Sequence, residues 1–528
     1  LQSRDGTHHY ARLRVPHNIP RFFFVTSEGD EMEADDPLGN RRIDVVPTEE
    51  IIGEFLPLLF PGYQVVSKGM FRITRNTDVE IEEDEADDLL EAVRDSVTRR
   101  QWGGVVRLET EHGMNLTEFI IQKMKLKPFQ VYSVKGPMAF AGYMALNDLD
   151  YPKLKDTPYF ASFNPDTQPV DKLFENIAKR DILLYHPYQT FTSVVDLVQQ
   201  AAKDPAVLGI KMTLYRVGNN SPIVKALMEA RQRGKQVTAV VELKARFDEE
   251  RNINWAEEME RQGVNVVYGF VGLKVHAKLC LVIRKEASGI RSYVHIGTGN
   301  YNPGSAKNYT DLGLLTSAQD ICSDVTDLFN VMTGYAVRDN YRRLFVSPTC
   351  MRSGIERAIR AEIERHKREG NGRIVLKCNQ LVDPDMIRLL YEASIAGVKV
   401  DCLVRGICCL KTGIKGISDN ITVRAILGKF LEHARVYWFG PLEDTEKSLC
   451  YMGSADLMGR NLDRRIEVVT PVLDEALKER IANEVLKLQL ADNARTWKLE
   501  GDEYERILPA EGKPLVDAQA LMSEKYGS

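Results

Sequence analysis

The stretches VHAKLCLVIR (residues 275–284) and EHARVYWFG (residues 432–440) repeat one pattern in two distant parts of the chain. In each, a His-Ala-basic triplet precedes an apolar run of β-prone residues, and the two histidines, His276 and His433, are 157 positions apart. Residues of this kind typically form a buried strand. A single histidine before a strand indicates little, because most such residues are satisfied polar groups. The repetition makes both histidines candidates for function.

The sequence that follows each histidine repeats as well. A glycine–hydroxyl turn follows in both copies, starting at Gly297 and at Gly453, which lie 21 and 20 residues after their histidines. Farther along comes an acidic residue, Asp311 in the first copy and Glu467 in the second. The same three features in the same order indicate an internal duplication.

Strand and helix patterns alternate from about residue 170 onward, which predicts α/β domains with buried sheets. Two of the helices, at 222–234 and 384–397, begin with Pro and end with Gly. The strands are expected at 206–217, 235–248, 264–270, 276–284 and 292–302, and then at 372–381, 398–406, 420–426, 433–439 and 449–456.

The section before residue 155 has mixed strand and helix patterns and is predicted to be a separate α+β head domain. Eight of the eleven residues at 78–88 are acidic. We interpret this run as a solvated helix start in preference to a divalent-metal site, because carboxylates in such runs mostly face water. Four prolines at 151–170 indicate a linker or the entrance to the next domain.

Composition sets limits on function. The chain has 528 residues and a formal net charge of −5, which argues against general nucleic-acid binding, and it has no apolar run long enough for a membrane span. All eight cysteines follow residue 279 without a CxxC pair, so we interpret them as reduced core thiols of a cytosolic protein. The first residue is Leu and no signal peptide is evident, so we expect a fragment of a longer chain.

Arginines are expected at the carboxyl ends of three strands, where open α/β sheets bind their ligands. They are Arg216, Arg246 and Arg405. Their guanidinium groups suit phosphate oxygens, although each could instead form a surface ion pair, above all Arg246 with Asp248 nearby. A glycine-bearing loop at 406–416 adds Lys411 and Lys415. If the two copies pack about an approximate two-fold axis, both histidines share one cleft, with the hydroxyl turns offered to an anion.

The two-histidine layout resembles the phospholipase D superfamily, whose repeats carry H-x-K-x-x-x-x-D followed by a G-S/T-x-N turn. The chain departs from that motif in three places. The aspartate positions hold Ile283 and Gly440, and the second lysine is Arg435. These departures argue against hydrolysis of a phosphodiester.

The chain resembles the long bacterial polyphosphate kinases more closely. The matching blocks cover nearly the whole chain in the right order: KMTLYRV, ELKARFDEERNINWAEEMERQGVNVVYG, KVHAKLCLVIR, HIGTGNYNPGSAKNYTDLGLLT, RGICCL and RNLDRRIEVVTPV. The resemblance implies two tandem phospholipase D-like α/β domains, at 156–330 with His276 and at 331–505 with His433. An α+β head domain precedes them at 1–155, and a C-terminal tail follows at 506–528. Nothing in the chain corresponds to the helical N-terminal domain of the family.

The resemblance also implies roles for individual residues. His276 would be the nucleophile that is phosphorylated, and His433 a second catalytic histidine in contact with nucleotide phosphates. Tyr309 and Arg405 would also bind the nucleotide, Tyr309 against the base. Arg216 and Arg246 fall at the family's magnesium–phosphate site; because a guanidinium cannot ligate a cation, we expect them to bind phosphate oxygens that Mg²⁺ also contacts.

The sequence therefore predicts a kinase that reversibly transfers the γ-phosphate of ATP through a phosphohistidine to inorganic polyphosphate. The expected partners are ATP or ADP and polyphosphate, without nucleic acid, in a homodimer or homotetramer. The resemblance implies a cytoplasmic protein with peripheral association at the inner membrane, for which composition gives no support. Two alternatives stay open, a phospholipase D-type phosphodiesterase or nuclease and a non-catalytic scaffold that binds polyanions.

Overall fold

The computed structural model describes residues 1–16, 18–26, 43–76, 90, 94, 103–218, 220–245, 248–269, 272–334, 336–509 and 511–527. The chain forms two compact units, one made of residues 1–81 and 95–158 and the other of residues 82–94 and 159–528. Two features predicted from the sequence, the acidic run at 78–88 and Arg246, lie outside the described residues.

The first unit contains two small sheets. Strands β1 (Phe22–Thr26) and β2 (Ile43–Pro47) pair antiparallel, and β3 (Phe71–Arg75), β4 (Val105–Glu111) and β5 (Val131–Val134) form a three-stranded sheet. Leu108, Ile120 and Leu126 form its buried core. The helices are α1 (Thr48–Glu54), α2 (Leu56–Leu59) and α4 (Thr117–Met124), with η3 (Pro128–Gln130), η4 (Phe140–Asp148) and η5 (Pro152–Leu154).

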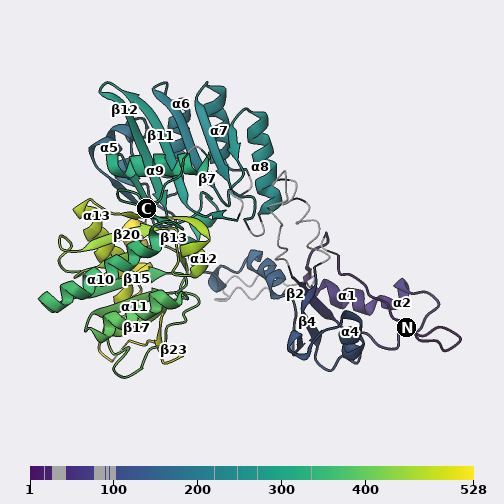
Figure 1. Ribbon diagram of the computed structural model, residues 1–528. Helices are drawn as coiled ribbons and strands as arrows, with labels where there is room; N and C mark the ends of the chain where they lie inside the picture. The colour runs from purple at the N-terminus through teal and green to yellow at the C-terminus, as the bar shows by residue number, and fades with distance from the viewer. Residues whose placement is uncertain are drawn as a thin grey trace, which may run out of the picture. The chain divides into compact units, whose positions relative to one another are not determined.

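The second unit begins with an α/β domain built on one sheet. Its strands are β6 (Ile182–His186), β7 (Val207–Leu214), β8 (Gln236–Val241), β9 (Asn265–Val267), β11 (Lys278–Glu286), β12 (Gly289–Gly297) and β13 (Tyr309–Thr316). The main order is β13-β12-β11-β7-β8-β9, and β6 pairs with β13. The helices pack along these strands (Figure 1) and are α5 (Leu173–Lys179), α6 (Thr192–Lys203), α7 (Pro222–Gln232), α8 (Glu249–Arg261) and α9 (Gln319–Met332), with η6 (Pro165–Thr167), η7 (Val170–Lys172) and η8 (Ser305–Lys307).

A second α/β domain has the same plan. Its strands are β14 (Phe345–Ser347), β15 (Arg373–Cys378), β16 (Lys399–Val404), β17 (Ile421–Ile426), β19 (Arg435–Phe439), β20 (Leu449–Gly453) and β21 (Arg465–Pro471), extended by β22 (Thr496–Glu500) and β23 (Glu503–Arg506). The order β21-β20-β19-β15-β16-β17, with β14 on β21, matches the first sheet strand for strand. The helices are α10 (Met351–Glu369), α11 (Pro384–Ile395), α12 (Gly459–Asp463), α13 (Glu475–Arg480), α14 (Leu488–Ala491) and α15 (Ala518–Tyr526), with the π-helix η9 (Ile481–Lys487).

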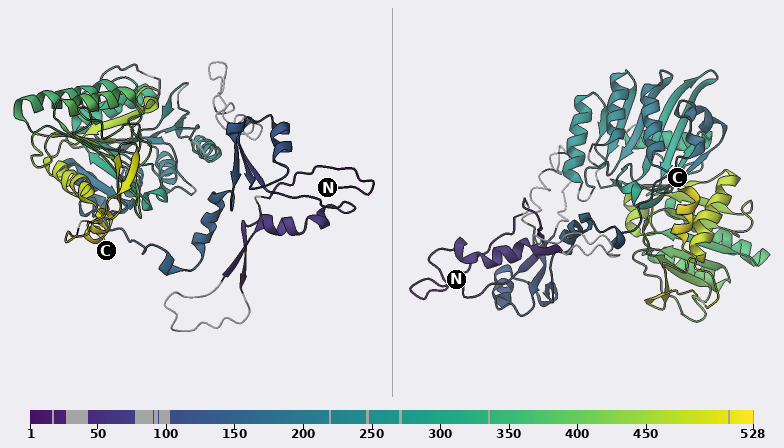
Figure 2. Two further views of the ribbon diagram at one scale, coloured as in Figure 1. Left: turned by 90° about the horizontal axis from the view of Figure 1, so that it is seen from below. Right: turned by 180° about the vertical axis from the view of Figure 1, so that it is seen from behind.

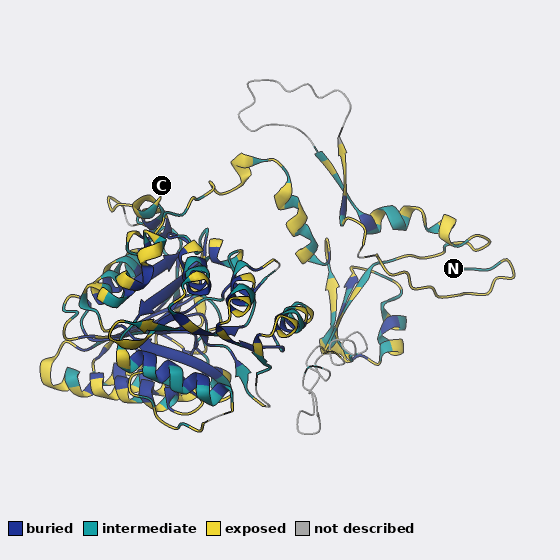
Figure 3. Ribbon diagram, turned by 90° about the horizontal axis from the view of Figure 1, so that it is seen from above, coloured by how far each residue is buried: buried dark blue, intermediate teal, exposed yellow. Residues whose placement is uncertain are grey.

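Local sequence accounts for the repeated units. Strand β11 carries five consecutive buried residues from Lys278 to Val282, as expected for a strand covered on both faces. Helices α7 and α11 begin at Pro behind a side-chain cap from Ser221 and Asp383. Gly234 and Gly397, at φ values of 83° and 97°, follow the helix ends in the left-handed region that glycine tolerates. The buried strands between partly exposed helices are visible in Figure 3.

Two short strands cross between the domains. Strand β10 (Lys274–Val275) belongs to the first domain but pairs parallel with β21 of the second, and β18 (Leu431–Glu432) belongs to the second but pairs parallel with β13 of the first. Each crossing strand stands immediately before one of the two histidines. In the right-hand view of Figure 2 the two domains accordingly lie next to each other, the first above the second.

An apolar core continues across the same boundary. Tyr185 and Leu312 of the first domain belong to one buried cluster with Val436 and Trp438 of the second. Trp438 has no exposed surface, and its indole N–H donates to the carbonyl of Gly440. Burial of this size favours a fixed arrangement of the two domains over independent motion.

The predicted fold class is confirmed: an α+β section precedes two tandem α/β domains that repeat one topology. One detail of the cysteine prediction is wrong. All eight thiols are free, and six are buried, but Cys408 is half-buried and Cys409 is exposed, because both lie in the loop after β16. No helix in the described part of the chain is long and apolar enough to cross a membrane.

Candidate active site

His276 lies in a two-residue break between β10 and β11, not within a strand. The backbone N–H groups of His276 and Ala277 both donate to the carbonyl of Ile466, at 2.9 and 3.0 Å. Ile466 is on β21 of the other domain, so the crossing strand fixes the backbone on which the histidine is carried. The imidazole is therefore placed at the boundary between the two domains.

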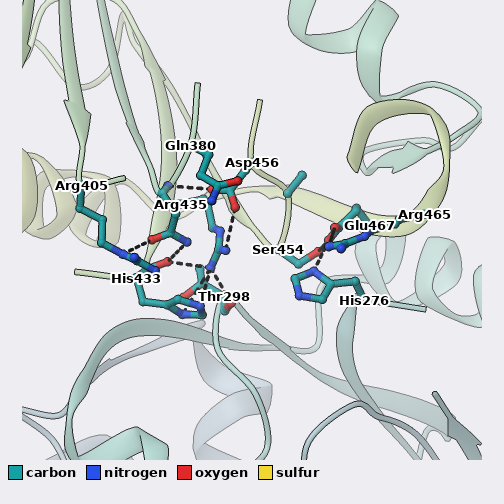
Figure 4. Close-up of polar contacts among 12 residues, drawn as sticks. His276, Thr298, Gln380, Arg405, His433, Arg435, Ser454, Asp456, Arg465 and Glu467 are labelled. Carbon is teal, nitrogen blue, oxygen red and sulfur yellow. Dashed lines mark hydrogen bonds and ion pairs between the residues drawn. The ribbon is translucent and has the colours of Figure 1, made fainter. Parts of the chain in front are cut away.

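The ring of His276 is held by a carboxylate of the second domain. Its Nδ1 is 2.9 Å from Oε2 of Glu467, and the hydroxyl of Ser454 donates to the same oxygen. Tyr215 packs edge-on against the imidazole, with ring centroids 4.8 Å apart. These contacts orient the ring with Nδ1 engaged and Nε2 directed away from Glu467 (Figure 4).

His433 has the reciprocal environment. Its Nδ1 lies 2.8 and 3.0 Å from the two carboxylate oxygens of Asp311, which belongs to the first domain, and the hydroxyl of Thr298 donates to Asp311 at 2.6 Å. Its backbone N–H donates to the carbonyl of Thr310. Each histidine is thus oriented by an acid of the opposite domain.

The hydroxyl turns differ from their predicted role. The sequence suggested that Thr298 and Ser454 would face a bound anion, but both donate to the buried acids instead. A buried carboxylate needs such donors, because an unsatisfied charge in the interior is costly. Glycine is required nearby, since a Cβ at Gly299 would lie 2.1 Å from Oδ2 of Asp311.

The two histidines differ in the cation beside the ring. Nη1 of Arg435 lies against the imidazole of His433, 3.2 Å from Nε2 and 3.3 Å from Nδ1, and donates to the carbonyl of His433, while Nη2 pairs with Asp456 at 3.1 Å. At the equivalent position of the first copy, Lys278 donates to the carbonyl of His276. Within the described part of the chain, Nε2 of His276 has no hydrogen-bond partner, and 13% of the side chain is exposed to solvent. His276 therefore has a nitrogen that is open to a reactant.

Burial and neighbouring charges set the protonation of the site. Burial, assisted by Lys278, Arg465 and Arg435, lowers the pKa of His276 well below its ordinary 6.5. Burial also raises the pKa of Glu467 to about 7 and lowers that of Lys278 to about 7. At neutral pH the imidazole of His276 is therefore uncharged, as a nucleophile must be.

Opposing effects act on the pKa of His433. Burial lowers the pKa of His433 as well, but Asp311 opposes that shift. Although burial acts to raise the pKa of Asp311, His433 and the Thr298 hydroxyl lower it below the usual range. An ionised acid behind His433 favours protonation of that ring whenever further negative charge binds in front of it.

The structure brings Arg405 and Tyr309 next to His433. Nε of Arg405 donates to Oδ1 of Asn379 at 2.9 Å and to the carbonyl of Glu432 at 2.7 Å. The ring of Tyr309, at the start of β13, lies 5.2 Å from the ring of His433. Both residues predicted to bind nucleotide thus lie at the second histidine.

Two other predicted cationic groups, Arg216 and Lys411, form ion pairs with carboxylates. Arg216 follows β7 as expected, but its Nε lies 3.3 Å from Asp248, the residue that the sequence suggested as a partner for Arg246. Lys411 pairs with Asp502 at 3.5 Å and is exposed. The loop at 406–416 therefore contributes less to the site than the sequence suggested.

Sequence reasoning missed several charged members of the site. Arg435, Asp456 and Arg465 surround the two histidines, and Arg465 lies 3.7 Å from Glu467 (Figure 4). One signal was available: Asp456 takes the fourth position of the second hydroxyl turn, where Asn300 stands in the first. A carboxylate at that position requires a buried cation, and Arg435 supplies it.

Family models match three consecutive parts of this chain. They are the polyphosphate kinase middle domain at residues 1–146, C-terminal domain 1 at 172–338 and C-terminal domain 2 at 344–519. The chain belongs to the polyphosphate kinase family. The two C-terminal models coincide with the duplicated α/β domains, so each histidine comes from one of them.

Relatives support the same assignment. The polyphosphate kinase of Mycolicibacterium paratuberculosis is 46% identical over all of this chain and 72% of its own length. Polyphosphate kinase 1 of Chlorobaculum tepidum is 46% identical over 97% of this chain and 72% of its own. The crystal structure of polyphosphate kinase from Porphyromonas gingivalis superposes with a TM-score of 0.79 at 31% identity, over 96% of this chain and 73% of that one. The kinase prediction is confirmed at the level of the family, and the alternatives of a phosphodiesterase and of a passive scaffold are set aside.

The reciprocal acids provide a first prediction. Glu467→Gln should lower the kinase rate by about 10²-fold or more, because an amide that donates to Nδ1 stabilises the tautomer with its proton on Nε2. Asp311→Asn should impair His433 in the same way. Turnover is the measurement, with circular dichroism and unfolding midpoints to show that each variant folds. Near-normal turnover in both variants would show that the acids do not orient the histidines.

The depressed pKa of His276 provides a second prediction. In protein labelled with ¹⁵N-histidine, the His276 imidazole should remain neutral as the pH is lowered through 6.5, the ordinary histidine value. Lys278→Met removes the second-largest cause of the shift and should move the titration back toward 6.5. Titration of wild-type His276 at or above 6.5 would contradict the assignment of a neutral nucleophile.

Proposed function

We propose that this protein is an ATP:polyphosphate phosphotransferase that works through a phosphohistidine on His276. The observation that carries the proposal is the contrast between the surroundings of the two imidazoles. The guanidinium of Arg435 lies against the ring of His433, near both of its nitrogens, whereas Nε2 of His276 has no protein partner among the described residues. His276 is therefore the better nucleophile, and His433 the better partner for an anion.

In the first step, Nε2 of His276 attacks the γ-phosphorus of ATP. A nitrogen–phosphorus bond forms, the bond from that phosphorus to the β,γ-bridging oxygen breaks, and ADP leaves with the electron pair on that oxygen. No base is needed, because the attacking Nε2 carries no proton, while Nδ1 keeps its own in a hydrogen bond to Glu467. The acid then compensates the positive charge that develops on the phosphorylated ring.

In the second step, a terminal oxygen of polyphosphate attacks the phosphorus of the phosphohistidine. The nitrogen–phosphorus bond breaks, its electron pair returns to Nε2, and the polymer is one phosphate longer. Because the nitrogen–phosphorus bond is energy-rich, the sequence of steps also runs backward and yields ATP from ADP and polyphosphate. Phosphoryl transfer depends mainly on positioning and on neutralisation of charge, which the buried cations provide.

His433 would stabilise the oxygens of the leaving phosphate. In the free protein its ring is predominantly neutral, because burial lowers its pKa and the guanidinium of Arg435 lies against the ring. A bound polyphosphate or nucleotide adds negative charge next to the ring, which favours the protonated form. Protonated His433 would then donate from Nε2 to the leaving oxygen while Asp311 holds Nδ1.

The nucleotide would bind on the side of the second histidine. Tyr309 offers a half-buried aromatic ring to the base, and Arg405 keeps two Nη groups for phosphate oxygens. We propose that Arg216 and Arg246 bind phosphate oxygens near the reacting group. For Arg216 this needs rearrangement of its contact with Asp248, a contact that is weak because 38% of the Arg216 side chain is exposed.

Mg²⁺ would enter with the nucleotide and not through a site of protein ligands. Among the described residues there is no group of three or more His, Cys, Asp or Glu side chains able to hold a metal ion. The residues that are present suit phosphate oxygens, so we assign no step to a protein-bound metal. When bound to the phosphates, the ion would neutralise part of their charge.

The remaining predictions stay proposals. We propose division of the chain into a head domain at 1–155, catalytic domains at 156–330 and 331–505, and a tail at 506–528. The family models at 1–146, 172–338 and 344–519 support the order of the first three parts, although the last model extends into the proposed tail. We also propose a cytoplasmic homodimer or homotetramer that associates peripherally with the inner membrane and acts on ATP, ADP and polyphosphate, without nucleic acid.

A third prediction separates the two histidines. With ATP labelled at the γ-phosphate, His276→Ala should form no acid-labile protein label and no polymer. His433→Ala should form the label about 10²–10⁴-fold more slowly, because it lacks the proton donor. A phosphoryl donor with a better leaving group should rescue His433→Ala and leave His276→Ala inactive.

Two results would contradict His276 as the nucleophile. Stable label at another residue in His276→Ala, or equal rescue of both variants, would show that His276 is not the nucleophile. Wild-type protein that forms polymer without any acid-labile label would contradict the phosphohistidine itself.

A further inference from the structure

Glu432, the residue before His433, is a buried carboxylate with four side-chain donors. Oε2 accepts from Lys377 at 2.5 Å, from Thr310 at 2.8 Å and from Gln489 at 2.9 Å. Oε1 accepts from Gln519 at 2.7 Å. Glu432, Lys377, Gln489 and Gln519 are all at most 4% exposed. A carboxylate with every donor in place is rigid, since movement would leave charges unpaired in the interior.

The donor on Oε1 comes from helix α15, near the end of the chain. Gln519 grips the strand before His433 in three ways: its Nε2 also donates to the carbonyl of Phe430 at 2.9 Å, and its Oε1 accepts from the N–H of Phe430 at 2.8 Å. One amide thus satisfies both backbone groups of Phe430 and one oxygen of Glu432. The space around it is tight, because a Cβ on Gly428 would lie 2.9 Å from Oε1 of Gln519.

The buried Glu432 is connected to Arg405 through its backbone carbonyl. The carbonyl of Glu432 accepts from Nε of Arg405 at 2.7 Å, and Oδ1 of Asn379 is the other acceptor. These two acceptors fix the plane of the guanidinium, while no hydrogen bond within the described residues involves its Nη groups. The direction in which Arg405 presents its remaining donors therefore depends on where Glu432 is held.

We propose that Gln519 of helix α15 is a positioning residue for nucleotide binding, acting through the clamp on Phe430 and Glu432 that orients Arg405. The inference rests on the proposed role of Arg405 toward nucleotide phosphates. His433 depends less on this clamp, because Asp311 holds its ring and Thr310 its backbone N–H. Loss of Gln519 should therefore weaken the binding of nucleotide more than it slows the chemical step.

The test is the Gln519→Leu variant of the whole protein, assayed with Mg-ATP at saturating polyphosphate. We expect KM for ATP to rise by about tenfold or more, as for a lost charge-assisted phosphate contact, with kcat within about threefold of wild type. Met522→Ala is the matched control. Met522 lies on the same helix and is 3% exposed in the apolar core that also contains Phe430, so its truncation loosens the packing of the helix but removes none of the hydrogen bonds to Glu432.

KM for ATP within twofold of wild type in Gln519→Leu would overturn the inference, as would an equal rise in Met522→Ala. If Gln519→Leu does not fold, Gln489→Leu removes a donor from the same carboxylate and should raise KM in the same direction; an unchanged KM there would overturn the inference too. Arg405→Ala is assayed in parallel. If it raises KM and Gln519→Leu does not, only the clamp is wrong; if Arg405→Ala also leaves KM unchanged, the proposed nucleotide site is wrong and the clamp with it.

Discussion

Each histidine of the site is held by a carboxylate of the opposite domain, and the rest of the structure depends on that exchange. His276 contacts Glu467, and His433 contacts Asp311. Neither α/β domain could orient its own histidine alone. The crossing strands β10 and β18 and the apolar core around Trp438 therefore serve the chemistry, because they keep each acid at hydrogen-bond distance from the ring that it orients.

Duplication produced two similar halves, and small substitutions give them different properties. The acid is a glutamate in one half and an aspartate in the other, and the pKa of Glu467 is raised by burial to about 7 whereas that of Asp311 is lowered by its contacts with His433 and Thr298. The residue two positions after each histidine is Lys278 in one half and Arg435 in the other. Only the forked guanidinium of Arg435 lies against the imidazole of its own histidine, within 3.3 Å of both ring nitrogens. Two similar halves can in this way supply different groups: a nucleophile, His276, and a histidine that stabilises the leaving phosphate, His433.

Much of this fold could be predicted from the sequence, because its signals are local or repeated. Apolar runs such as 278–282 indicated the buried strands, Pro and Gly marked the limits of α7 and α11, and the paired histidines indicated the duplication. The reciprocal contacts could not be predicted. They join residues as far apart as His276 and Glu467, and strands of two residues leave no periodic pattern to find. Nothing in the composition of residues 506–528 indicated that Gln519 would contact the strand before His433.

The central claim is that the contact with Glu467 reserves Nε2 of His276 for phosphate. The most direct measurement is NMR of the phosphorylated protein, trapped with γ-labelled ATP at alkaline pH, because the two isomers of phosphohistidine have distinct ³¹P and ¹H–³¹P signatures. We expect one phosphohistidine, at His276, with phosphorus on Nε2 and a proton still on Nδ1. Phosphorus on Nδ1 of His276, or stable phosphate on His433, would contradict the claim.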